Sequence, residues 1–211
     1  MVKKVLEYIT NLWYSIFRIG DCKVGVSSMD SNRFWKLIDK IFSINKKLGV
    51  NNSSNNMLNV LDIAKYFSSF ETMTHKKLQK LVYYAYAWYI ALYNDDADHI
   101  TNRLCCDTSF EAWVHGPVCR TLYNYCGDNY GCVPKYEGEI SALIIDDLKK
   151  FLDKIYKTFG KYTGDELESM THQEMPWKNA RDTLSPSQPS TKKISERDMF
   201  IYYNNLNDES N

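Results

Sequence analysis

Apolar residues recur at helical spacing along most of the chain. The strongest pattern runs from residue 74 to 93 and is apolar around most of its circumference, which is typical of a central helix. Other patterns predict helices over 57–70, 139–159, 165–171, 176–181 and 195–204, and one that starts at Pro117 and ends near Cys126. Residues 110–114 alternate in polarity and predict a short strand. The sequence therefore predicts a mainly α fold with at most a short β hairpin.

The first 50 residues predict a separate helical hairpin. Its two helices cover residues 2–19 and about 30–42, and their apolar stripes include Trp13, Phe17 and Phe34. An uncharged, Asn- and Ser-rich tract at 51–56 is typical of a linker. We therefore expect an N-terminal extension at 1–50, a linker at 51–56, a domain at 57–204 and a disordered tail at 205–211.

Charge is distributed unevenly, although the formal net charge is zero. Residues 1–50 carry nine Lys and Arg against four Asp and Glu, whereas the remainder from Met57 carries 17 against 22. A basic extension on an acidic domain can meet an acidic partner, a lipid surface, nucleic acid or its own domain. The zero balance argues against nucleic-acid binding as the main activity.

Several features point to a cytoplasmic location. The longest apolar stretch without charge, 81–94, is too short to span a bilayer, and Glu7 and Arg18 interrupt any signal-peptide pattern. Six cysteines are present, but none forms a Cys-x-x-Cys pair. We expect reduced thiols, with no metal and no cofactor.

Three short motifs are more specific than composition. They read KLQKLVYYA over residues 77–85, EAWVHGPV over 111–118 and MTHQEMPWKNAR over 170–181. In this order they resemble the Panacea domain, the family of SocA-like antitoxins and GepA-like phage-associated proteins. The resemblance covers about residues 57–204 and leaves out the first 50.

Most motif residues have a structural explanation. The core is expected to hold Leu78, Leu81 and Tyr84, whereas Lys77, Gln79 and Lys80 should point outward, as a solvated face or as partner contacts. Gly116 suits a backbone conformation that side-chained residues avoid, and Pro117 should begin the following helix. Trp113 is expected in the core or as a half-buried anchor.

The third motif allows two interpretations. In the first, Thr171 and Glu174 fix the start of the helix at Pro176, His172 forms a hydrogen bond within the same turn, and Trp177 and Arg181 are structural. In the second, His115, His172 and Glu174 form a metal site or an acid–base pair. The spacing offers no second ligand near His172, so we expect no catalytic site.

The resemblance implies an antitoxin, which binds and neutralises a cognate protein toxin and, in some members of the family, delivers it to a protease or its chaperone. Trp13, Phe17 and Phe34 of the extension are then expected to contribute to partner choice, together with Lys77, Gln79 and Lys80. The alternatives for the extension are packing on its own domain and homodimerisation. A phage-associated DNA-binding regulator is the alternative for the whole chain, although the connection at 20–30 is long for a helix-turn-helix.

Overall fold

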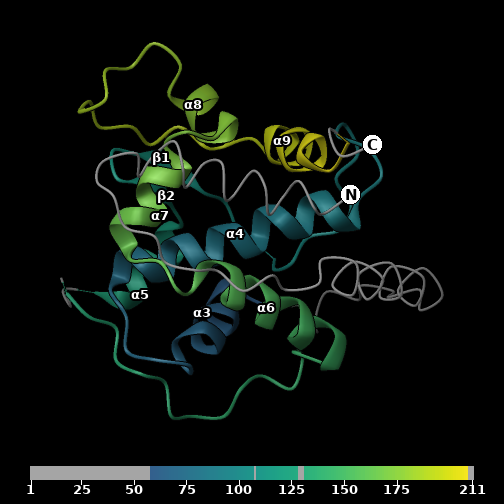
Figure 1. Ribbon diagram of the computed structural model, residues 1–211, viewed down its shortest axis with the longest axis vertical. Helices are drawn as coiled ribbons and strands as arrows, with labels where there is room; N and C mark the ends of the chain where they lie inside the picture. Colours follow the sequence, from purple (N-terminus) through teal and green to yellow (C-terminus); the bar gives the residue numbers. More distant parts are fainter. Residues whose placement is uncertain (1–57, 107, 128–130, 209–211) are drawn as a thin grey trace, which may run out of the picture. The chain divides into compact units, whose positions relative to one another are not determined.

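The computed structural model describes residues 58–106, 108–127 and 131–208. Within these residues the fold is mainly α, with seven helices and one two-stranded antiparallel hairpin, as the sequence predicts (Figure 1). The predicted N-terminal helices, with Trp13, Phe17 and Phe34, and the linker at 51–56 lie outside the described residues. The described residues up to Tyr202 belong to one compact unit.

Two consecutive helices open the described part. Helix α3 spans Val60–Ser68 and begins with a capping box, in which Asn59 and Asp62 satisfy each other's backbone N–H groups. Helix α4 spans His75–Tyr93 after Thr74, whose hydroxyl accepts a hydrogen bond from the Lys77 N–H. The prediction of a helix over 74–93 is therefore confirmed, with Thr74 as its N-cap.

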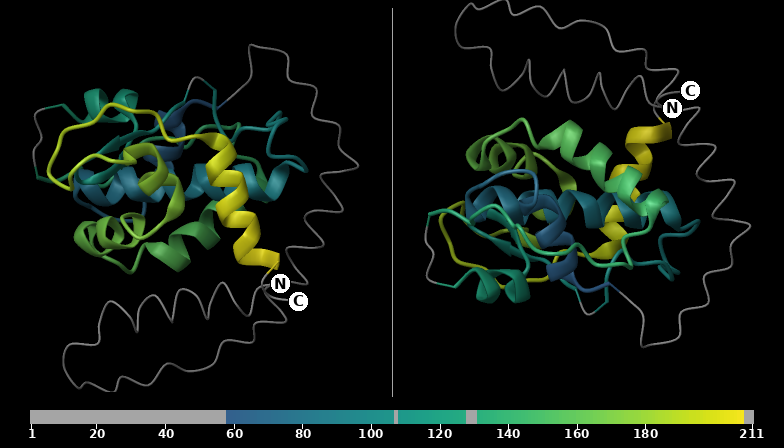
Figure 2. Two further views of the ribbon diagram at one scale, coloured as in Figure 1. Left: turned by 90° about the horizontal axis from the view of Figure 1, so that it is seen from above. Right: turned by 90° about the horizontal axis from the view of Figure 1, so that it is seen from below.

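Helix α4 is the centre of the domain (Figures 1 and 2). It packs against α3, α6, α7 and the hairpin, and most of its side chains are buried. Tyr83 and Tyr84 of the first motif and Tyr86, which follows it, contribute to this core, since all three are nearly inaccessible to solvent. A helix surrounded in this way explains why its apolar pattern covers most of the circumference.

The hairpin consists of β1, Glu111–Trp113, and β2, Gly116–Val118. Along the other edge of β1, the Ala112 N–H bonds to the Lys192 carbonyl, at 2.8 Å, and the Ile194 N–H bonds to the Phe110 carbonyl, at 2.7 Å. The prediction that Pro117 begins a helix is wrong: it pairs with Ala112 inside β2, and α5 starts only at Arg120 and ends at Cys126. Proline has a fixed φ that a short edge strand tolerates as well as a helix start does.

The remaining helices differ from the predictions mainly at their ends. Helix α6 spans Asp146–Phe159, so the predicted start at 139 is wrong; Asp146 and Asp147 occupy its first turn, where carboxylates are favourable. Helix α7, Gly164–Thr171, starts with a capping box between Thr163 and Glu166. Helix α8 spans Met175–Arg181 and contains Pro176 in its first turn, as predicted. Helix α9 spans Glu196–Asp208 and so continues past the predicted end at 204.

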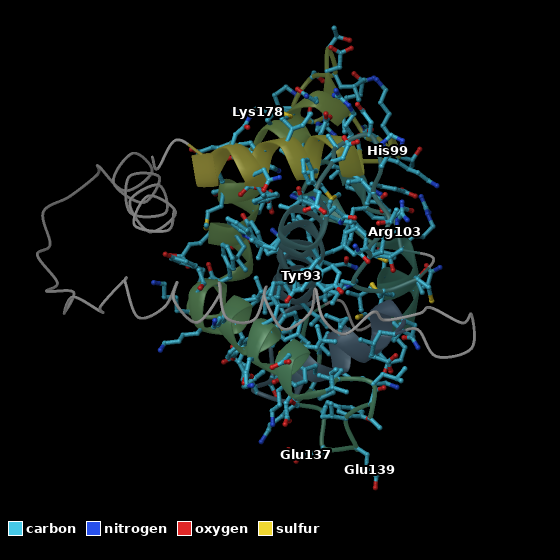
Figure 3. The ribbon with its side chains drawn as sticks, turned by 90° about the vertical axis from the view of Figure 1, so that its right-hand side faces the viewer. Tyr93, His99, Arg103, Glu137, Glu139 and Lys178 are labelled. Carbon is cyan, nitrogen blue, oxygen red and sulfur yellow. The ribbon has the colours of Figure 1, made fainter. Side chains whose placement is uncertain are left out.

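A charged group lies at the C-terminal end of α4. Arg103 binds both carboxylate oxygens of Glu196, with its Nη2 atom 2.7 Å from Oε2, and Glu196 also accepts a hydrogen bond from the Tyr86 hydroxyl, at 2.5 Å. Figure 3 shows Tyr93 near this end of the helix, with His99 and Arg103 in the segment that follows. These contacts join α4, that segment and the start of α9.

The described residues also show the state of the cysteines and the character of the helices. Cys105, Cys106, Cys119, Cys126 and Cys132 are free thiols, as expected. Among the helices of the described residues, none has the length and apolar character needed to cross a membrane.

Candidate functional site

The first motif places polar side chains inside the domain. Gln79 is 2% exposed and Lys80 is 1% exposed, so the prediction that they point outward is wrong. Lys77 is also largely covered, and its Nζ atom lies 2.7 Å from Oε1 of Glu71. Leu78, Leu81 and Tyr84 are buried as predicted. Gln79 and Lys80 face the hairpin in this fold. This burial removes the basis for expecting these two residues to contact a partner.

Gln79 binds the end of the hairpin through both ends of its amide group. Its Oε1 atom accepts a hydrogen bond from the Cys119 N–H, at 2.9 Å, and its Nε2 atom donates to the Cys119 carbonyl, at 3.2 Å. The backbone N–H can only donate, so these two bonds fix which end of the amide carries nitrogen. The bond of 3.1 Å between Gln79 Nε2 and His75 Nε2 therefore requires the histidine nitrogen to accept.

This acceptor role keeps His75 neutral. Burial lowers the pKa of its imidazole, and the positive charge of Lys80 acts in the same direction. A proton on Nε2 would place an N–H group opposite the N–H₂ group of Gln79. His75 thus reports on the integrity of the Gln79–Cys119 contact.

The Lys80 side chain binds strand β2 of the hairpin. Its Nζ atom donates a hydrogen bond to the Pro117 carbonyl, at 3.0 Å. Burial lowers its pKa to about 7, although Glu168 opposes the shift and Lys76 adds to it. An ammonium group in this position is stabilised mainly by one carbonyl and one nearby carboxylate.

Gly116 is required by this packing. Its φ is +88°, as the sequence led us to expect, and a Cβ atom at this position would lie 2.7 Å from Cε of Lys80 and 2.8 Å from Oγ1 of Thr171. Both the backbone conformation and the lack of space therefore exclude a side chain.

The third motif binds the same hairpin from the other direction. The Trp177 indole donates to the Trp113 carbonyl, at 3.1 Å, and the Arg181 guanidinium donates to the Ala112 carbonyl, at 3.0 Å. Arg181 also binds three carbonyls of the loop at 185–188 and stacks on the Trp177 ring, 5.0 Å from its centroid. One guanidinium group thus joins β1 to the loop that follows α8.

His172, Thr171 and Glu174 do not have the roles predicted for them. His172 bonds to the backbone of Val114 instead of within its own turn, and it stacks on Trp177 with 4.1 Å between ring centroids. The Thr171 hydroxyl donates to the Glu168 carbonyl within α7. Glu174 precedes α8 without a side-chain cap, and its Oε1 atom instead accepts from the Tyr84 hydroxyl, at 2.9 Å. Buried carboxylates need such a partner more than a helix start needs a cap.

We call the set that binds the hairpin backbone the hairpin anchor. Its members come from α4 and from the segment between α7 and α8, and they are Gln79, Lys80, His172, Trp177 and Arg181. Almost every backbone group that these side chains bind is a carbonyl oxygen. The first and third motifs are about 90 residues apart in sequence, and the second motif lies between them in space. Together they hold the hairpin in one position.

The anchored hairpin presents a set of exposed and half-buried side chains to solvent, which we call the hairpin face: His75, Lys76, Trp113, His115, Arg120 and Tyr123. The Tyr123 ring lies 5.2 Å from His75 and 5.0 Å from Trp113, between ring centroids, and the Arg120 guanidinium lies over Trp113 at 5.6 Å. Trp113 is half-buried, which agrees with the predicted anchor role. On the α7 side of the hairpin, His115 Nδ1 and Lys76 Nζ lie 3.0 Å and 2.6 Å from the Glu168 carboxylate.

Three comparisons with known proteins complete the description of the site. Residues 78–178 match the family model described as "Antitoxin SocA-like, Panacea domain". This central stretch of the chain is similar to the Panacea domain. No curated protein and no solved structure matched the chain.

The matched range, 78–178, is narrower than the range of about 57–204 over which the motifs suggest a resemblance. It leaves out Lys77, the first residue of the first motif, and Arg181, the last residue of the third motif. It nevertheless contains most of the hairpin anchor and all of the hairpin except its contact with Arg181. The description of the family supports an antitoxin-type role and a protein partner for this domain.

The alternative of a metal-dependent enzyme finds no geometry to support it within the described residues. Glu174 is buried against Tyr84, His172 is stacked on Trp177, and His115 is exposed and paired with Glu168. Across residues 58–106, 108–127 and 131–208, no group of three or more His, Cys, Asp and Glu side chains is placed to hold a metal ion.

Sequence reasoning missed four residues of the hairpin face, namely His75, Lys76, Arg120 and Tyr123, and also Glu168, which pairs with Lys76 and His115. The first two immediately precede a family motif, and they had been assigned only to the start of a helix. Arg120 lies two residues after the second motif, and its ion pair with Glu111 at 2.7 Å was the one contact that proximity in sequence could have suggested. The contact between Glu168 and α4 is tertiary and has no local signal.

Proposed function

We propose that this protein is the antitoxin of a toxin–antitoxin module, which binds and neutralises a cognate protein toxin in the cytoplasm. The observation that carries the proposal is the hairpin anchor. In this domain the polar side chains of the motifs bind backbone groups of the same domain, so they build a rigid scaffold and leave the exposed hairpin face for a partner. The family match supports the antitoxin assignment.

The proposal is tested with the protein encoded beside this gene. Expression of that neighbour alone should arrest growth, co-expression of this protein should restore growth, and the two should copurify as a stoichiometric complex. Arrest that persists despite soluble co-expression, without any complex, would contradict the proposed function.

The mode of neutralisation needs a second measurement. Delivery to a protease shortens the half-life of the toxin, whereas blocking leaves the half-life unchanged and only removes activity. We therefore propose a pulse–chase measurement of the toxin in cells with and without this protein, repeated in strains that lack individual cytoplasmic proteases.

We further propose that residues 1–50 contribute to partner choice, with Trp13, Phe17 and Phe34 in contact with the toxin. Their apolar stripes need a surface that so short a segment does not supply by itself. The chain without residues 1–50 should then bind the toxin more weakly than the full chain. Equal affinities would contradict this part of the proposal.

A further inference from the structure

We propose that the hairpin face is the surface on which the toxin docks, and that it receives a toxin segment carrying carboxylate side chains beside apolar ones. This inference rests on the proposed function and adds the place and the chemistry of the contact. Three properties of the hairpin face support it: its residue types, the arrangement of its charges and its rigidity.

The residue types are those that contribute most to binding at protein interfaces. Tyr123 and Arg120 both contact Trp113, with the two rings tilted by 54°, and Trp, Tyr and Arg are the side chains enriched at binding hot spots. Their aromatic rings offer apolar area at low cost in conformational entropy. The group is only half covered by its own domain, so a partner can cover the remainder.

The charges of the hairpin face are arranged with cations outside and carboxylates beneath. Arg120 is 53% exposed and its partner Glu111 is 13% exposed, and Lys76 is 33% exposed whereas its partner Glu168 is 18% exposed. A partner therefore meets guanidinium and ammonium groups first. Asp165, which is 88% exposed and pairs with Lys76, is the exception at the edge of the set.

Another charged surface of the domain lacks this arrangement. In the segment after α4, His99 and Asp96 are 80% and 54% exposed, and Arg197 and Asp98 are 56% and 66% exposed. Both signs face solvent to a similar extent there, so that surface has no preference for an acidic partner. Charge complementarity thus favours the hairpin face.

The hairpin anchor makes the hairpin face rigid before binding. Trp113 is held through its carbonyl by Trp177 and through its indole by Glu111, at 2.7 Å, and Glu111 also orients Arg120. A surface already fixed in its bound arrangement loses little conformational entropy on association.

The test compares matched charge-neutralising variants of the full chain. The probe is the purified product of the adjacent reading frame, and its affinity is measured at about 50 mM and about 300 mM NaCl, which span strong and weak screening of exposed charges. The variants are Lys76→Gln with Arg120→Gln, and separately Tyr123→Ala. The matched control is Lys157→Gln, an exposed lysine of α6 without any role in the hairpin face. Thermal unfolding verifies that each variant is folded.

We expect the double variant to weaken binding by about ten-fold or more at low salt and to reduce the dependence on salt, while the control stays within about two-fold of wild type. Tyr123→Ala should weaken binding at both salt concentrations. Wild-type binding that is unchanged in both sets of folded variants would overturn this inference and leave the proposed function intact. Absence of wild-type binding would overturn both, and a homodimer lost in the same variants would assign the surface to a second copy and overturn the inference.

Discussion

At the scale of single residues, Gly116 joins two constraints that can be separated by experiment. Its positive φ disfavours any side chain, and a Cβ atom would also meet Lys80 and Thr171. Gly127 has a positive φ of 56° with open space around its Cβ position, and Gly131 has open space and no such φ. These three glycines form a natural series.

We predict that Gly116→Ala lowers the free energy of unfolding by about 2–4 kcal/mol, because backbone strain of about 1 kcal/mol adds to overpacking of about 1–3 kcal/mol. Gly127→Ala should show only the first effect, and Gly131→Ala neither. Chemical denaturation of the three variants measures the order. Equal effects at Gly116 and Gly127 would show that Lys80 and Thr171 make room.

Lys80 predicts a dependence of stability on pH with a definite sign. Its folded pKa of about 7 lies well below the ordinary lysine pKa of 10.5. A group with a depressed folded pKa of this kind contributes stability above its unfolded pKa and loses it as the pH falls toward the folded pKa. Between pH 7 and 9, wild type should therefore gain stability relative to Lys80→Met, by at most about 1.4 kcal/mol per pH unit.

The comparison with Lys80→Met removes other titrations from the result. Burial raises the pKa of Cys105 to about 12 and also raises those of Cys119 and Cys126, which opposes a gain in stability at high pH in both proteins equally. The measurement is urea denaturation at pH 7, 8 and 9. A difference that stays constant over this range would show that Lys80 is not desolvated in the folded protein.

At the scale of elements, the helices were predictable and their contacts with the hairpin were not. The apolar pattern of α4 and the local signals at Thr74, Thr163 and Pro176 determine where helices start. The same string that places Leu78 in the core gives no sign that Gln79 and Lys80 are buried too, because their partners are backbone carbonyls about 40 residues away. Pro117 suits a strand and a helix start equally, so only its pairing with Ala112 decides between them.

Arg181 is the element-scale test of the anchor. Its planar guanidinium binds Ala112 and the loop at 185–188 at once, which a single ammonium group does not reproduce. We predict that Arg181→Lys lowers the free energy of unfolding by about 1–3 kcal/mol, since buried carbonyls lose their donors. Hydrogen exchange at the Ala112 and Ile194 amides, which pair β1 with residues 192–194, should accelerate.

The matched control for this substitution is Arg197→Lys. Arg197 pairs with Asp98 on the surface, where both side chains are more than half exposed. Its effect on the free energy of unfolding should be much smaller than that of Arg181→Lys, as for other exposed pairs. Comparable losses at positions 181 and 197 would contradict the anchor role.

At the scale of the whole molecule, mild acid should destabilise the domain through its buried histidines. Burial lowers the pKa of His75 and of His172, so their stabilising effect is complete above about pH 6.5 and is lost as the pH falls through their folded pKa values. The lowered pKa values of Glu111 and Glu168 act only at more acidic pH. In the interval from pH 7.5 to 5.5, the two buried histidines and Lys80, whose pKa is about 7, therefore all act in the same direction.

We predict that the melting temperature falls between pH 7.5 and 5.5, and that the fall is smaller in His75→Gln, which has no imidazole to protonate. His99→Gln is the control with the opposite sign, because Asp96 raises the pKa of His99. Differential scanning fluorimetry of the three proteins provides the data. An unchanged fall in His75→Gln would exclude His75 as the acid-sensitive group.

The hairpin anchor binds mainly backbone carbonyl oxygens, and every amino acid has the same backbone carbonyl group. A substitution at Val114 or His115 therefore leaves the carbonyl acceptors of Ala112, Trp113 and Pro117 in place. The side chains of the turn between β1 and β2 can therefore change without weakening the hairpin anchor. The backbone groups that fix the hairpin are thus separate from the side chains that the hairpin exposes to solvent.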